Sequence, residues 1–213
     1  MKTGAPSFRR RSIFLAAAGI LALVLTACTG RGGGYLPPDS VAGFTGQASL
    51  GFTFSCQDSG GINPPTGKLA IELAYLDKGS NPIGSSFSIH GIVDVIDPVL
   101  ESAVCIGNTP APGGKLIFLG RYYLTSSAPA GFPSTCPTPK TKTATTLLCR
   151  FEVQVQDNDR NMAPSKGDFF SIQLSTHIAY CDGSPLGECS QLPAGSVFYT
   201  RAGFLAGGNI TVK

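Results

Sequence analysis

Apolar and polar residues alternate along most of the chain between positions 46 and 213. In GQASLGFTFSC (46–56), apolar or small side chains occupy every second position, and Ser, Gly and Thr occupy the positions between them. A period of two residues is typical of a β-strand with one buried face. The same pattern, or an apolar run of strand length, recurs seven times: 68–76, 86–96, 114–125, 148–157, 168–180, 196–203 and 208–213.

The pattern predicts an all-β fold. Strands that are apolar on one side belong to antiparallel sheets with one face on a core and one face in water. Two such sheets bury their apolar faces against each other. We therefore expect a single antiparallel β-sandwich of seven or eight strands over residues 46–213, with a closed β-barrel as the alternative.

Residues 28–45 lack this periodicity. The segment after Cys28, TGRGGGYLPPDSVAGFT, is rich in Gly and Pro. Such composition favours a flexible linker. We expect residues 28–45 to form a tether that begins at Cys28.

The first 27 residues have the layout of an export signal. A cationic block, Arg9–Arg11, precedes an apolar run that ends near Thr26. The run is shorter than the ~20 residues that span a bilayer as a helix. Arg10 and Arg11 also fit a twin-arginine signal loosely, so the export route stays open.

The end of that run, Leu25-Thr26-Ala27-Cys28, resembles the lipobox of bacterial lipoproteins. The resemblance implies cleavage before Cys28 and attachment of a diacylglycerol to its thiol. It also implies a location in the cell envelope, on the outer face of a membrane. An ordinary secretion signal with an incidental cysteine is the alternative.

Cleavage would change the charge of the chain. All four basic residues of the first 27 positions would be lost, which leaves 12 basic and 13 acidic residues. The mature chain is therefore close to neutral and has no basic run of the kind that binds nucleic acid. We expect no nucleic-acid partner.

Six cysteines remain once Cys28 is assigned to the lipid. An even number in an exported domain indicates disulfides, here three. We expect sequential pairing, because the last two pairs each flank a turn-rich loop. The expected pairs are Cys56–Cys105, Cys136–Cys149 and Cys181–Cys189.

One polar loop has the spacing of a calcium site. Asp157, Asp159, Asn161 and Asp168 occupy loop positions 1, 3, 5 and 12 in DNDRNMAPSKGD. Met162 stands where an EF-hand needs glycine, and strands flank the loop, which excludes an EF-hand. Calcium is the one cofactor that the sequence suggests. The alternative is a hairpin loop whose Asp and Asn side chains cap their own backbone.

No catalytic motif is present. The chain contains no GxSxG elbow, no HExxH and no P-loop. His90 shares a strand face with Asp94 and could form a dyad with it, and His177 falls on an outward face. Solvated strand positions are the simpler interpretation of both histidines.

Three segments resemble the post-COAP domain, a bacterial β-domain of exported proteins: GQASLGFTF, VQVQDND…SKGDFFSI and GGNITV. The resemblance spans residues 46–213 and implies a β fold and export. The six cysteines and the long Pro/Thr loop at 126–146 depart from that family. The resemblance implies no activity.

We therefore expect a non-enzymatic binding or structural module, anchored in the envelope through Cys28, with an envelope protein or a glycan as partner. The alternatives are a small exported hydrolase and a calcium-stabilised adhesion module.

Overall fold

The computed structural model describes residues 27–58, 67–93, 114–136, 148–158, 167–177, 192–193 and 195–213. For residues 27–28, 56–58, 67–69 and 93 it describes the backbone alone. The described residues contain nine strands and no helix. The strands are β1 (Ala27–Leu36), β2 (Ala48–Asp58), β3 (Gly67–Asp77), β4 (Phe87–Val93), β5 (Lys115–Leu124), β6 (Arg150–Gln156), β7 (Phe169–Ser175), β8 (Val197–Phe204) and β9 (Gly207–Val212).

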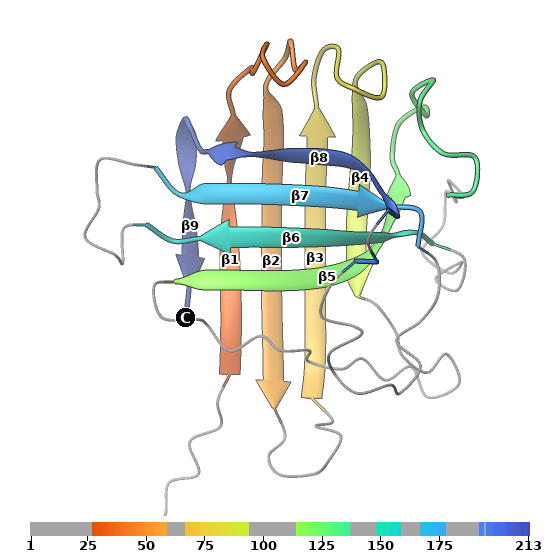
Figure 1. The fold of residues 1–213 in the computed structure, drawn as a ribbon. Coiled ribbons are helices and arrows are strands. Elements are labelled where there is room, and N and C mark those ends of the chain that lie inside the picture. The colour runs from red at the N-terminus through yellow and green to blue at the C-terminus, as the bar shows by residue number, and fades with distance from the viewer. Residues whose placement is uncertain are drawn as a thin grey trace, which may run out of the picture.

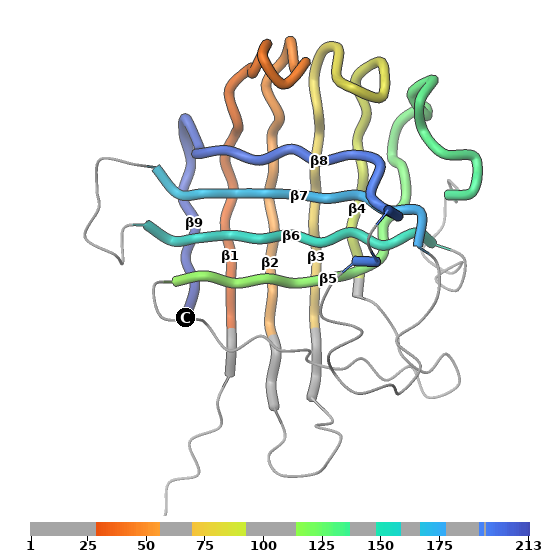
Figure 2. The backbone as a smooth tube through the Cα atoms, viewed as in Figure 1, coloured from red at the N-terminus to blue at the C-terminus, as the bar shows by residue number. Residues whose placement is uncertain are grey.

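The nine strands form one antiparallel sheet in the order β8-β7-β6-β5-β4-β3-β2-β1-β9. Each strand from β1 to β7 pairs with the next one along the chain, and β9 returns to pair with β1. The sheet curls over on itself, so that β5–β8 cross in front of β1–β4 and β9 (Figure 1). Figure 2 shows the same crossing along the backbone. The all-β, antiparallel prediction is confirmed.

The core lies between the two halves of this curled sheet. The rings of Phe52 on β2 and Phe118 on β5 are 5.5 Å apart, and those of Tyr75 on β3 and Phe170 on β7 are 6.3 Å apart. All four side chains are buried. The apolar positions of the alternating pattern therefore face the core, as the period of two predicts.

The strands do not form two separate sheets. Residues of β4 and β5 pair from Ile89↔Leu124 to Val93↔Gly120, so the second layer continues the first by hydrogen bonding. The result is a half-barrel and not the predicted sandwich. Glycines make this corner: a Cβ on Gly91 would lie 2.6 Å from the Phe151 ring, and one on Gly120 would lie 2.7 Å from it.

The predicted tether is wrong over β1. This strand lies inside the sheet, between β2 and β9. Its glycines are required by packing: a Cβ on Gly30 would meet the Leu116 side chain at 2.5 Å, and one on Gly34 would meet the Gly207 carbonyl oxygen at 2.3 Å. The sheet therefore begins at Ala27, and the domain boundary predicted at residue 46 is also wrong.

One predicted disulfide is confirmed. Cys136 and Cys149 are bonded and close a loop with a sequence separation of 13. Cys105, Cys181 and Cys189 lie outside the described residues, as does the side chain of Cys56. The other two pairings stay predictions.

The export signal predicted for residues 1–27 stays a prediction, because all of it except Ala27 lies outside the described residues. Within the part of the chain that is described, no helix is long and apolar enough to cross a membrane.

Candidate binding face

The exposed face of the first half of the sheet brings together residues from both ends of the chain. We call this surface of β9, β1, β2 and β3 the outer face. Across it, Thr211, Arg31, Thr53 and Glu72 lie directly opposite one another on four successive strands. Cross-strand neighbours of this kind have Cβ atoms about 5 Å apart, so their side chains can act on one ligand.

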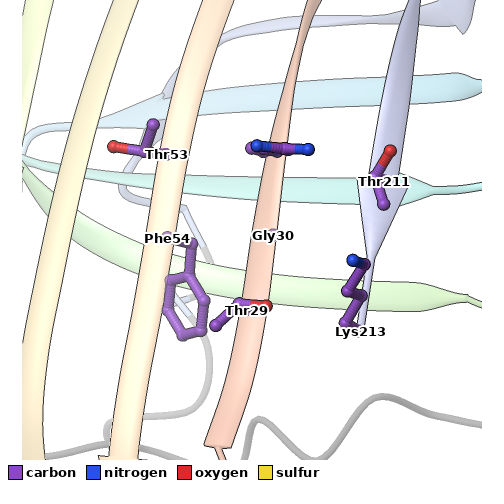
Figure 3. Close-up of a pocket in the computed structure, with 7 residues that line it drawn as sticks. Thr29, Gly30, Thr53, Phe54, Thr211 and Lys213 are labelled. Atoms are coloured by element: carbon purple, nitrogen blue, oxygen red, sulfur yellow. The ribbon is translucent and has the colours of Figure 1, made fainter.

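A pocket of about 310 Å³ lies at the end of this face where β1 begins and β9 ends. We call it the Arg31 pocket. Figure 3 shows Thr53 on β2 and Thr211 on β9, with β1 running between them. The pocket is lined by Thr29, Gly30, Arg31, Thr53, Phe54, Thr211 and Lys213.

The pocket is cationic. Arg31 and Lys213 are both exposed, and no carboxylate side chain is among the lining residues. Within the described residues, neither cation forms an ion pair. Three threonine hydroxyls line the same pocket. Two cations with hydroxyl donors beside them are the groups that bind phosphate or carboxylate.

The carboxylate closest in register is Glu72, which lies opposite Thr53 on the neighbouring strand. Its Oε2 is 2.7 Å from Nε2 of His90 on β4. This pairing draws its charge toward β4 and away from β1. Glu72 is not among the residues that line the pocket.

His90 pairs with a different carboxylate from the one that the sequence suggested. Its partner is Glu72, while Asp94, the partner that the sequence suggested, lies outside the described residues. The His90 ring packs against Tyr123, with ring centroids 5.2 Å apart. The pocket lining does not include His90, Glu72 or Tyr123. His177 lies beyond the end of β7, where its backbone carbonyl accepts a hydrogen bond from the Arg150 N–H.

The carboxylates of the predicted calcium loop cap backbone groups. Asp168 accepts hydrogen bonds from the N–H groups of Asn158 (2.9 Å) and Ile210 (2.6 Å), and Asp157 accepts one from Val212 (3.3 Å). The bond to Asn158 lies within the loop, as in the hairpin alternative, while the other two join the loop to β9. Among the described residues no cluster of His, Cys, Asp and Glu could hold a metal. Asp159 and Asn161 lie outside them, so the calcium site stays a prediction.

The core contains a charged cluster that the sequence reading missed. Arg201 on β8 lies 2.6 Å from Asp77 at the end of β3, and both are almost wholly buried, at 2% and 0% exposed. The same guanidinium donates to the carbonyls of Pro37 (2.9 Å) and Gly46 (2.8 Å). The cluster therefore ties β3, β8 and the β1–β2 connection together.

Two tyrosines complete this cluster. The Tyr199 hydroxyl donates to Asp77 at 2.5 Å, so the Tyr75 hydroxyl must donate to Tyr199, 2.6 Å away. Burial raises the pKa of both phenols, which keeps them neutral. Burial also raises the pKa of Asp77, and the hydrogen bond from Tyr199 and the charge of Arg201 oppose that rise. The polar atoms of the cluster bond to one another, which makes its role structural.

Cys28 lies at the start of β1, next to the Arg31 pocket. In the register of β1 and β2 it stands directly opposite Cys56. From the sequence we expect Cys28 to carry a lipid and Cys56 to form a disulfide with Cys105. The register adds a competing arrangement, a bond between Cys28 and Cys56 across the two strands.

Sequence reasoning did not find the Arg31 pocket, because its residues fall in the predicted tether, in 46–56 and in 208–213. The exposed Thr-x-Arg alternation at 29–31 was its only local signal. No family model, no curated protein and no solved structure matches this chain. The resemblance to the post-COAP domain stays a prediction.

Proposed function

We propose that this chain is a non-enzymatic module of the bacterial cell envelope, anchored by a lipid on Cys28, whose outer face binds an anionic group. The observation that carries the binding role is the Arg31 pocket. It combines two exposed cations and three threonines, with no carboxylate side chain among its lining residues.

The anchoring role is supported by the sequence around Cys28. The lipobox-like Leu25–Cys28 would place the cut directly before Cys28. Two or three acyl chains hold a protein on a membrane where a single chain does not. Because β1 begins at Ala27, the mature chain would enter the sheet at its first residue.

The binding role favours an anion over a neutral sugar. Charge-assisted hydrogen bonds from guanidinium and ammonium groups to phosphate or carboxylate are about twice as strong as neutral ones. The pocket presents both kinds of cation close together: Arg31 lies opposite Thr211, and Lys213, two residues after Thr211, exchanges backbone hydrogen bonds with Thr29. An anionic group on an envelope glycan, lipid or protein would fit this chemistry.

The test is a thermal melt of the soluble mature chain carrying Cys28→Ser, with and without 10 mM inorganic phosphate at constant ionic strength. A site with Kd of ~1 mM stabilises the native state by about 1.4 kcal/mol under these conditions. We expect the melting temperature to rise by about 3–6 °C in a chain of this size.

Three variants show whether the rise in melting temperature depends on the pocket. Arg31→Gln and Lys213→Gln should each remove most of the rise. Lys78→Gln should keep it, because Lys78 is exposed but follows the far end of β3. An equal rise in all four proteins would reflect a general salt effect of phosphate and would contradict the proposal.

A further inference from the structure

The position of the Arg31 pocket relative to Cys28 indicates where its anion comes from. Arg31 follows Cys28 by three residues in an extended strand, which is about 10 Å. Lys213 is closer still: its backbone exchanges hydrogen bonds of 3.0 and 2.8 Å with Thr29, the residue after Cys28. Both cations therefore lie near the level of the anchor.

A lipid on Cys28 would bring this end of the sheet to the membrane surface. No linker separates Cys28 from β1, so the anchor cannot hold the domain away from the bilayer as a 17-residue tether would. The polar layer of a bilayer is about 5–7 Å thick on each side. With β1 along the membrane normal, Lys213 would lie within this layer and the long Arg31 side chain would reach into it.

We propose that the Arg31 pocket holds the headgroup phosphate of an anionic phospholipid in the same membrane, which docks the domain directly on the bilayer. This inference rests on the proposed anchoring through Cys28. Each basic residue near an anionic surface favours contact by about 1 kcal/mol, or roughly fivefold. Two such residues fix an orientation that the lipid alone would leave free.

The test compares two exposed lysines in one molecule. The lipidated protein is purified from membranes, placed in phosphatidylglycerol vesicles and acetylated with a water-soluble amine reagent. Mass spectrometry of peptides then gives the rate at each lysine. Lys213 should react at least about fivefold more slowly than Lys78, which follows the opposite end of β3.

Two controls define the cause of this protection. The reference is the ratio of the acetylation rates at Lys213 and Lys78 in the soluble Cys28→Ser chain without vesicles. In lipidated Arg31→Gln, the protection of Lys213 should fall, because a phosphate held by two cations loses one of them. Arg31 is exposed, so this variant should fold, which its melting temperature verifies.

The docking would be overturned if acetylation of Lys213 and Lys78 were slowed equally relative to the soluble chain, or if neither lysine were slowed. If free phosphate still raises the melting temperature of the soluble chain, the pocket binds an anion from another source and the proposed function survives. If neither effect occurs, both proposals fail.

Discussion

At the residue scale, the buried pair Asp77–Arg201 links the two halves of the curled sheet. Opposite charges in a core cost desolvation, and they are tolerated here because each has several partners at hydrogen-bond distance. The pair joins strands 124 residues apart. It therefore holds the two halves of the curled sheet in one relative position.

Breaking this pair should be costly. Arg201→Met leaves the Asp77 carboxylate buried without its counter-charge, and Asp77→Leu leaves the guanidinium in the same state. Each should lower the free energy of unfolding by about 3–5 kcal/mol. Urea denaturation of each variant measures the loss.

The double variant provides the control. With both charges gone, no uncompensated ion remains, so the Asp77→Leu/Arg201→Met chain should lose much less than the sum of the single losses. Additive losses would show that the two side chains act independently, against the pairing seen here.

The sequence contained a signal for this pair that was not used. Period-two alternation from Ile71 through Tyr75 puts Asp77 on the inward side, and alternation from Tyr199 does the same for Arg201. Opposite charges at inward positions of two strands indicate a buried ion pair. Which strands lie together is the information that the pattern lacks.

At the element scale, β1 is the strand that the sequence pattern did not predict. Four of its ten residues are glycine, a composition that normally favours flexible linkers. The absence of side chains is what lets neighbouring groups approach, such as Leu116 at Gly30 and the Gly207 carbonyl at Gly34. Tertiary packing therefore overrides local propensity in this element.

A matched pair of glycine variants tests the packing of β1. Gly34→Ala would place a Cβ 2.3 Å from the Gly207 carbonyl oxygen, and this backbone contact can be relieved only by a shift of the strand. We expect it to lower the free energy of unfolding by about 1–3 kcal/mol. Chemical denaturation measures the change.

Gly51→Ala on β2 is the control, because no atom lies within 4 Å of the Cβ it would add. Alanine is also favoured over glycine inside a strand by roughly 0.5–1 kcal/mol. This variant should be as stable as the parent chain or slightly more so. If Gly34→Ala were equally harmless, residues 27–36 would behave as the linker that their composition suggests.

At the scale of the whole molecule, the alternating pattern predicted what is buried and failed to predict how the layers connect. Phe52 and Phe170 are buried, as the alternating pattern predicts. The curl of one sheet into a half-barrel depends on the β4–β5 pairing and on Gly91 and Gly120. Neither strand partners nor corner glycines can be identified from periodicity.

The proposed binding site could not be predicted from periodicity either. Arg31 and Lys213 are 182 positions apart in the chain, and only the antiparallel pairing of β1 with β9 brings them together. One disulfide, Cys136–Cys149, could be predicted because it closes a local loop. Contacts between distant segments could be identified only from the three-dimensional structure.

The most direct test of the whole account is the mass of the N-terminal tryptic peptide from protein extracted from membranes. Trypsin cuts after Arg31, so the mature chain should yield Cys28–Arg31, heavier than the free peptide by a diacylglycerol on the thiol, with or without an acyl group on the amine. An N-terminus upstream of Cys28, or Cys28 recovered in a disulfide with the peptide that contains Cys56, would contradict both the anchor and the docking that depends on it.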